Sequence, residues 1–502
     1  MARKQYLETL IASLTQGELK RFALYTKTYA SNKTYLNLFK SIRKNQQKVS
    51  QKYDNKYAQQ RRYLYRAILE SLILKDNDKS PESEVLFLIK SASYLVKKQL
   101  PEQAYAVINK ALQLVRKNEM FGYHIEIIEQ EKQVRLYTNP KAHRSNDEIV
   151  QEEKDLILFQ SELQSLKLIY NHILNYKKQY GYIDKEMWED LKKEVVEMGM
   201  PPNASYCATQ KSKYYYYFSQ TLLHWLVHFH KPAYLYSSNF LQIDSGPLSK
   251  SEYLNGLLEH SSSCLCLGKI DEVVDILSMV QHKYEKGMFG QYDNITLRIF
   301  YYRSNYELMS HIYMGDQEKV IQKIAEIENG IAYWGRKIPL EMQLILASVL
   351  KLGYFAVKDY KKARTQIVFL IQNYKSGLRL DAYEDGLMSN LIYLFTKDDR
   401  IYLEEQAQKT LKYFQNNGQD NNLDIQMKIK VSRLFLAYGK YQITKKEFLT
   451  GFQKALEDKM AYFDNHFSET DYPYLIWVNS KLYDKDYLEM AREMAPKRLN
   501  LK

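Results

Sequence analysis

Histidine and cysteine are the residue types in this chain whose spacing could support chemistry. His224 and His228 are four residues apart, and His230 follows closely. On a helix, a spacing of four places two imidazole rings on one face, where a metal ion could bridge them. No glutamate follows His224, so the metalloprotease pattern is absent, and no further ligand stands nearby. We interpret the three histidines as packing residues of an aromatic-rich helix, and the sequence predicts no metal site and no cofactor.

Compact catalytic motifs are also missing from the sequence. The chain has no glycine-rich phosphate loop, no nucleophile elbow and no ordered ligand ladder of a calcium loop. Cys264 and His311 occupy equivalent positions, each nine residues ahead of a valine, Val273 or Val320, and we interpret both as packing residues. The sequence therefore predicts that the protein is not an enzyme. The alternative is an active site assembled from residues far apart in the sequence.

Positive charge is concentrated near the N-terminus. Residues 1–80 contain 17 Lys and Arg against 6 Asp and Glu, a balance of +11 out of the chain's +13. Between Glu18 and Asp54 the basic residues are interleaved with Phe and Tyr, which is typical of a surface that binds nucleic acid or another polyanion. The alternative interpretation is a solvated, solubilising helical face. The candidate polyanion contacts are Lys20, Arg21, Lys40, Arg43, Lys44, Arg61 and Arg62.

About four helices are predicted in this basic segment. Thr15 and Glu18 have the spacing of a capping box at the start of the second helix. The short gap at 30–33 permits a helix-turn-helix, although no glycine marks the turn. The polar string at 76–81 predicts the first domain boundary. The expected helices cover residues 6–14, 15–29, 34–44 and 53–74.

Four apolar triplets recur in the C-terminal half at a nearly constant spacing. Their first members are 47, 43 and 44 residues apart. Such a rhythm is typical of stacked helical hairpins and not of a single compact core. Short polar turns precede the helices, and Asp271, Asp316 and Asp359 can cap the helices that follow them. The triplets are Val273, Leu277 and Val280; Val320, Ile324 and Ile327; Ala363, Ile367 and Leu370; and Ala407, Leu411 and Phe414.

The stretch from Val357 to Ala363, which reads Val-Lys-Asp-Tyr-Lys-Lys-Ala, resembles the turn and second helix of the tetratricopeptide family, and residues 98–111 are similar. The resemblance covers about residues 85–135 and 250–415, with a period longer than the family's roughly 34 residues. It implies a right-handed α-α superhelix, which is a solenoid of helical hairpins, and a role in protein recognition. The family's carboxylate clamp of Lys and Asn does not carry over to the equivalent positions.

The sequence therefore predicts an all-α fold in which a basic helical N-terminal segment precedes a right-handed solenoid. Breaks rich in proline and glycine at 199–203 and 244–250 separate a middle region from the regular array. The predicted divisions are 1–80, the basic segment; 81–250, divergent helical hairpins; 251–470, the tetratricopeptide-like array; and 471–502, a C-terminal capping region.

Protein or peptide binding is the function that this architecture predicts. The side chains of the first helix of each hairpin should line the concave face of the array. The candidate groove residues are Arg303, Asn305, Lys351 and Tyr354. The sequence does not specify which protein is bound. The alternative is a nucleic-acid-associated regulator in which residues 1–80 contact phosphate and the repeats sense a protein or peptide.

Composition predicts a folded cytoplasmic protein without membrane insertion. Of 502 residues, 45% are apolar and 26% charged, and no apolar run approaches about 18 residues. Glu8 interrupts the first apolar stretch, so the chain does not begin like an export signal. Three cysteines are too few for a disulfide framework. The 45 tyrosines suit helix interfaces and adaptable binding grooves.

Overall fold

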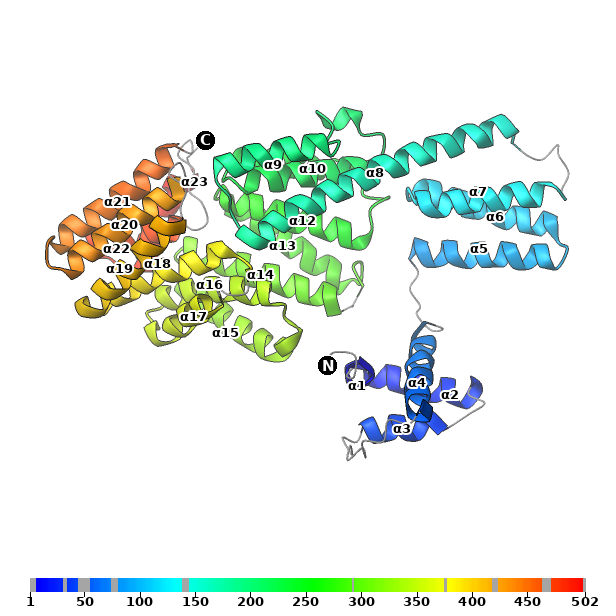
Figure 1. The fold of residues 1–502 in the computed structure, drawn as a ribbon, viewed down its shortest axis with the longest axis horizontal. Coiled ribbons are helices and arrows are strands. Elements are labelled where there is room, and N and C mark those ends of the chain that lie inside the picture. Colours follow the sequence, from blue (N-terminus) through cyan, green and yellow to red (C-terminus); the bar gives the residue numbers. More distant parts are fainter. Residues whose placement is uncertain are drawn as a thin grey trace. The chain divides into compact units, whose positions relative to one another are not determined.

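The all-α prediction is confirmed by a computed structural model of the chain (Figure 1). Every regular element in the described residues is a helix. The chain divides into two compact units, Met1–Lys90 and Ser91–Lys502. The described residues are 6–29, 34–43, 55–73, 80–137, 144–290, 293–373, 377–417, 423–462 and 471–499.

The first unit is a small helical bundle. Helices α2 and α3 both pack on α4, and α1 packs on α3. The core includes Phe22 and Phe39, whose ring centroids are 4.9 Å apart. At the start of α2, Thr15 and Glu18 form the predicted reciprocal capping bonds, because each backbone N–H is bonded to the other's side chain. The helices of this unit are α1 (Tyr6–Ser13), α2 (Gln16–Tyr29), α3 (Thr34–Arg43) and α4 (Asn55–Ile73), and the first part of α5 (Pro81–Lys97) also belongs to it.

The second unit holds the rest of α5 and all later helices. Its helices are α6 (Pro101–Lys117), α7 (Phe121–Arg135), α8 (Asn146–Tyr180), α9 (Lys185–Glu197), α10 (Gln210–Trp225), α11 (His230–Phe240), α12 (Lys250–Cys266), α13 (Ile270–Glu285), α14 (Asp293–Tyr313), α15 (Gln317–Trp334), α16 (Leu340–Ala356), α17 (Tyr360–Gln372), α18 (Leu380–Thr396), α19 (Arg400–Asn417), α20 (Leu423–Gly439), α21 (Lys445–Tyr462), α22 (Asp471–Leu482) and α23 (Tyr487–Leu499), with short 3-10 turns at Ala204–Tyr206 and Gly335–Lys337.

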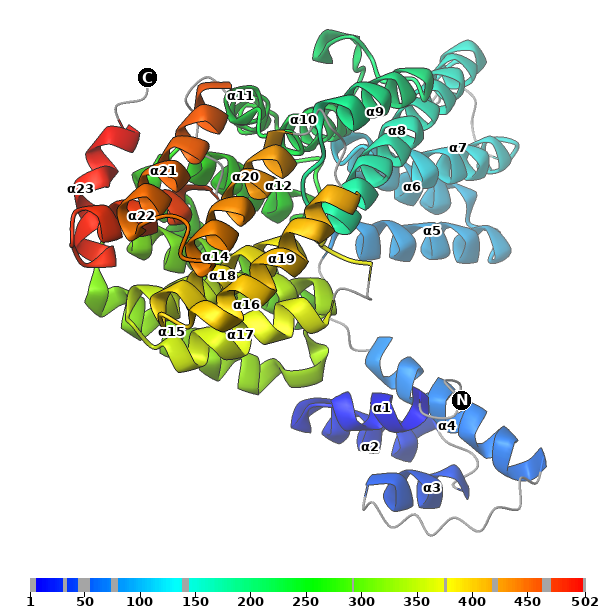
Figure 2. The same ribbon diagram turned by 60° about the vertical axis from the view of Figure 1, so that its left-hand side comes forward.

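Consecutive helices of this unit pack as pairs. The pairs α12–α13, α14–α15, α16–α17 and α18–α19 are in contact, and the first helices also contact one another in the order α12, α14, α16, α18, α20 (Figure 2). The predicted apolar triplets lie on the second helices α13, α15, α17 and α19. All twelve residues are buried except Leu411, which is half-buried. The recurring stripe is thus the face by which each second helix packs onto its neighbours.

The turn inside each pair uses a residue in the left-handed region. The φ angles are 71° at Gly268, 65° at Gly315, 63° at Lys358 and 53° at Asp398. Asp316 and Asp359 cap α15 and α17, as the sequence predicted, by accepting the backbone N–H three residues later. The predicted cap at Asp271 is wrong, because Lys269 occupies the N-cap position of α13 without a side-chain bond and Asp271 lies within the first turn.

Segments far apart in the sequence meet within this unit. Helix α8 contacts α18, and the backbone N–H of Arg379 donates to the carbonyl of Lys178 at 3.0 Å. Helix α23 contacts α14, and Arg492 Nη2 donates to the carbonyl of Gly315 at 2.7 Å. The helical array therefore curves enough for its end to pack on its middle.

Replacing Gly315 by alanine should weaken the contact between α23 and the turn after α14. A Cβ atom at Gly315 would lie 2.3 Å from the carbonyl oxygen of Leu488, and the residue has a φ of 65°. We expect a loss of roughly 1–3 kcal/mol in the free energy of unfolding of the second unit, measured by urea denaturation. Gly122→Ala is the control, because a Cβ there has no heavy atom within 4 Å. Equal midpoints for the two variants would contradict the prediction.

Membrane-spanning helices and disulfides are the two remaining features that the sequence analysis addressed. No helix in the described residues has the length and apolar character that a membrane crossing requires. All three cysteines, Cys207, Cys264 and Cys266, are buried and unpaired with one another.

Candidate functional site

An inner cavity of about 290 Å³ lies in the second unit. Its walls come from α8, α10, α12, α14, α16, α18 and α22, together with Tyr182 and Arg379 just ahead of α9 and α18, whereas the partner helices α13, α15, α17 and α19 contribute no lining residue. One layer of helices therefore faces the cavity and the other packs behind it. The aromatic lining residues are Tyr170, Tyr182, Phe218, Trp225, Tyr301, Tyr302, Tyr306 and Tyr474.

Most charges in the wall of the inner cavity are paired with one another. Lys177 Nζ lies 3.1 Å from Glu259 Oε2 and 4.5 Å from the centre of the Trp225 ring. The hydroxyl of Tyr302 donates to Glu259 Oε1 at 3.0 Å. Burial, together with the Glu259 charge, raises the pKa of Tyr302 well above its usual value, so that this hydroxyl stays protonated and remains a donor.

A second pair closes the α8 end of the cavity. Arg379 holds Asp381 through two hydrogen bonds, from Nε at 2.8 Å and from Nη2 at 2.5 Å. Gly181 caps the C-terminal end of α8, and a Cβ there would lie 2.1 Å from the Asp381 carboxyl carbon. Glycine therefore lets the end of α8 approach this carboxylate closely.

A third pair lies between α16 and α18. The ammonium of Lys351 is bonded to Asp385, and the Tyr474 hydroxyl donates to Asp385 Oδ1 at 2.5 Å. Lys351 is fully buried, and burial lowers its pKa although Asp385 acts in the opposite direction.

Four polar groups of the lining remain available. Arg298 uses only Nη1, which donates to Ser251 Oγ at 3.0 Å and to Asn255 Oδ1 at 2.5 Å. Within the described residues, no group accepts from its Nε or Nη2, and no carboxylate pairs with it. In the same part of the chain, the side chains of Glu341 and Asn305 have no hydrogen-bond partner, nor does the buried hydroxyl of Ser348. The inner cavity thus presents one open guanidinium edge, one carboxylate and two neutral polar groups.

A second cavity of about 400 Å³ shares Tyr182, Asp381, Asp385 and Tyr474 with the first. Its wall includes a chain of buried charges, in which Lys428 joins Glu384 to Asp424, and Lys459 joins Asp424 to Asp471. These charges are satisfied by one another, so we assign them to the stability of α20, α21 and α22 and not to ligand binding.

The four predicted groove residues do not come together in the structure. Asn305 lines the inner cavity. Arg303 instead bonds to Glu307 and to Gln281 of α13, because two residues along a helix rotate a side chain by about 200°. Lys351 and Tyr354 are buried within the helix layers, and Tyr354 donates to Glu328 of α15 at 2.6 Å. Lys351 and Tyr354 therefore do not offer side chains to a partner on the concave face, because both are buried.

Several lining residues that the sequence analysis missed share one stripe of α14 with Asn305. The spacing from Asn305 would have revealed them, since successive members are one or three residues apart, as one face of a helix allows. The stripe consists of Arg298, Tyr301, Tyr302, Asn305, Tyr306 and Met309.

The candidate polyanion contacts lie on three helices of the first unit. Arg61 of α4 is bonded to both carboxylate oxygens of Glu8, at 2.5 and 2.7 Å, so its charge is already neutralised. Lys40 and Arg43 are three residues apart on one exposed face of α3. Lys44 lies outside the described residues. Lys20 and Arg21 of α2 and Arg62 of α4 are exposed.

The histidine group lies in aromatic packing, as the sequence interpretation held. The ring of His228 stacks on Tyr182 with centroids 4.0 Å apart, and His224 Nδ1 is bonded to the carbonyl of Gln220 at 2.8 Å. His228 and His230 have centroids 5.6 Å apart in an edge-to-face arrangement.

Comparison with known proteins adds no relative. No protein-family model matches the chain, and no curated protein or solved structure is significantly similar to it. The tetratricopeptide resemblance therefore stays a prediction from the residues, and the functional argument depends on the inner cavity.

Proposed function

We propose that the protein is a non-enzymatic, tetratricopeptide-like scaffold that binds a peptide segment of a partner protein in the inner cavity. The observation that carries this proposal is the origin of the lining, which comes from one helix layer together with α8 and α22. An array that turns one layer inward offers a preformed surface, and a rigid surface lowers the ordering cost of binding.

The open edge of Arg298 suggests what the segment carries. Its Nε and Nη2 groups form the planar fork that matches a carboxylate with two parallel hydrogen bonds. Tyr301 and Tyr306 lie on the same stripe of α14 and offer aromatic surface beside it. We therefore propose a segment in which an Asp, Glu or C-terminal carboxylate stands next to an apolar or aromatic side chain.

Glu341 and Asn305 would contribute the remaining selectivity. Glu341 is a carboxylate without a partner among the described residues, so it suits a Lys, Arg or amino group of the same segment. The amide of Asn305 can both donate to and accept from a peptide backbone. A segment that carries both charges would therefore satisfy the groups that the wall leaves open.

Arg298→Ala should abolish most of this binding. Peptides would be selected from a random library on the immobilised full-length protein, and their affinities measured by fluorescence anisotropy. We expect the selected peptides to contain a carboxylate, to bind more weakly as salt is raised, and to lose at least about 30-fold in affinity for Arg298→Ala. Arg298→Lys should restore only part of the loss, since an ammonium cannot make the fork.

Arg336→Ala is the matched control, because Arg336 is exposed in the 3-10 turn after α15 and does not line the cavity. Circular dichroism would establish that each variant is folded. The proposal fails if no peptide is enriched, or if the enriched peptides bind Arg298→Ala as tightly as the unchanged protein.

A further inference from the structure

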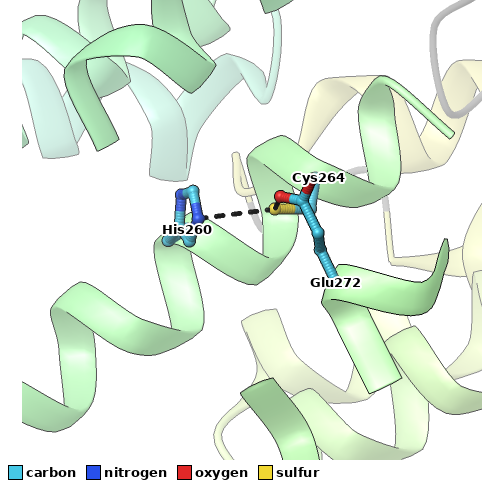
Figure 3. Close-up of side chains that lie close together, drawn as sticks. All are labelled: His260, Cys264 and Glu272. Atoms are coloured by element: carbon cyan, nitrogen blue, oxygen red, sulfur yellow. Dashed lines mark hydrogen bonds between the residues drawn. The ribbon is translucent and has the colours of Figure 1, made fainter. Parts of the chain in front are cut away.

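Three metal-ligating side chains converge away from the inner cavity, where α12 turns into α13. His260 and Cys264 stand one helical turn apart on α12, and Glu272 reaches them from α13 (Figure 3). One donor atom of each residue lies within 4.8 Å of the other two. Among the described residues, this is the one group of three or more His, Cys, Asp or Glu side chains arranged in this way.

The distances already resemble those between ligands of a tetrahedral zinc ion. Cys264 Sγ is 3.6 Å from His260 Nε2 and 3.5 Å from Glu272 Oε2. Zn–S and Zn–N bonds of about 2.3 and 2.0 Å at a tetrahedral angle place sulfur and nitrogen about 3.5 Å apart. Two of the three distances between donor atoms therefore already suit a tetrahedral zinc ion, and the donor atoms of His260 and Glu272 lie within 4.8 Å of each other.

Ser237 is placed to act as an outer partner of His260. Ser237 Oγ lies 2.9 Å from His260 Nδ1 and 3.0 Å from the carbonyl oxygen of Tyr234. With its single hydrogen directed to that carbonyl, the hydroxyl can accept the hydrogen of Nδ1. Nε2, which lies 3.6 Å from Cys264 Sγ, is then free to bind a metal ion, as in other metal-binding histidines that have an outer partner.

Glu272 is oriented in the same way. Lys269 Nζ donates to Oε1 at 2.6 Å and the Tyr234 hydroxyl donates to Oε2 at 3.0 Å, which leaves Oε2 facing the thiol. The side chain of Glu272 is 41% exposed, so an ion has a route from solvent. Cys264 and His260 are buried, which protects the sulfur.

We propose that His260, Cys264 and Glu272 bind one Zn²⁺ ion. Imidazole, thiolate and carboxylate together suit zinc, and the two negative ligands balance its charge. When the ion binds, the Cys264 thiol releases its proton to water, and the thiolate sulfur coordinates the ion. The fourth position would be taken by water. The ion would join α12 to α13 and, through Ser237 and Tyr234, to α11. This site shares no residue with the inner cavity and does not depend on the proposed peptide binding.

The test is zinc binding by the reduced, full-length protein after chelator treatment. Titration against a chromophoric chelator should give one Zn²⁺ per chain, and Co²⁺ in its place should produce a thiolate-to-cobalt charge-transfer band. Cys264→Ser and Glu272→Gln should remove this site and the band. Ser237→Ala should weaken binding roughly 10- to 100-fold, because it removes only the outer partner of His260.

Cys266→Ser is the control, since Cys266 is a buried thiol on the same helix that belongs to a different apolar cluster. It should bind zinc and show the cobalt band like the unchanged protein. Zinc should also raise the melting temperature of the unchanged protein and not that of Cys264→Ser. Absence of stoichiometric binding, or equal binding by Cys264→Ser and the unchanged protein, would overturn the proposal. Glu272→Gln is partly exposed and tests the site even if Cys264→Ser does not fold.

Discussion

Replacing Lys459 by methionine is expected to lower the free energy of unfolding of the second unit by about 3–5 kcal/mol. The Lys459 ammonium on α21 is buried and lies 2.5 Å from Asp424 Oδ1 and 2.7 Å from Asp471 Oδ2. Methionine keeps much of the shape of the side chain and removes the charge. Asp424 and Asp471 would then lose the cation that they share, and Asp471 would stay buried, whereas the side chain of Asp424 is 28% exposed.

The protonation states support a large effect. Burial opposes ionisation of Asp424, but Lys428 and Lys459 overcome it and hold its pKa well below the usual range. Burial likewise opposes the charge of Lys459, yet Asp424 and Asp471 raise its pKa. Both partners are thus charged at neutral pH, and the loss of one leaves the other in a poorly solvated environment.

Lys430→Met is the matched control. Lys430 of α20 pairs with Asp458 of α21 at 2.8 Å, and both side chains are about half exposed, at 49% and 56%. An exposed pair of this kind contributes less than about 1 kcal/mol. Urea denaturation of both variants would decide the matter. The burial of Lys459 would be contradicted if Lys459→Met lowered the free energy of unfolding by no more than Lys430→Met does.

Acidification from pH 7 to pH 5 is the second large expected effect. Burial, assisted by the nearby ammonium groups of Lys459 and Lys428 and opposed by Asp424, lowers the pKa of His228 to about 3. An unfolded histidine has a pKa of about 6.5. Between these values the unfolded chain binds a proton that the folded chain rejects. Stability is therefore complete above about pH 6.5 and falls as the pH decreases toward 3.

The titration of His228 alone should lower the free energy of unfolding by about 2 kcal/mol between pH 7 and pH 5. Burial also lowers the pKa of four other histidines, which act in the same direction; they are His124, His224, His260 and His311. Glu384 acts in the opposite direction, because burial raises its pKa and protonation then favours the folded state. We expect the net effect of these groups to be a clearly lower free energy of unfolding of the second unit at pH 5 than at pH 7.

The measurement is the free energy of unfolding in urea at several pH values. His228→Asn should have a shallower pH dependence, and asparagine tolerates the φ of 61° at this position. Because the smaller side chain also changes packing, the slope with pH and not the stability at pH 7 is the relevant quantity. An unchanged slope would show that His228 is not the group responsible.

Local sequence patterns were sufficient for the helices and for their buried faces. The triplet that begins at Val273 and its three counterparts lie on second helices and are buried, with Leu411 half-buried. The cap at Asp316 also forms as predicted. These features depend on helical periodicity and on hydrogen bonds over three or four residues, which are visible in a linear sequence.

The candidate site was only partly predictable. Of the candidate groove residues, Asn305 lines the inner cavity, whereas Lys351 and Tyr354 are buried within the helix layers. A helix in a stacked array has neighbours on two sides, so an apolar-polar period does not distinguish the inner face from a face that packs on the next hairpin. The sequence analysis therefore missed Arg298 although it lies seven residues before Asn305.

The sequence by itself determined that the chain is helical, where most of its helices pair and which stripe each second helix buries. Only the tertiary structure decided which polar groups meet, because those contacts join different helices. Lys459 reaches Asp424 across 35 residues, and Arg492 reaches Gly315 across 177. The third ligand of the proposed zinc site also comes from the next helix. Such contacts depend on how helices pack against one another, which is not encoded in any single helical period.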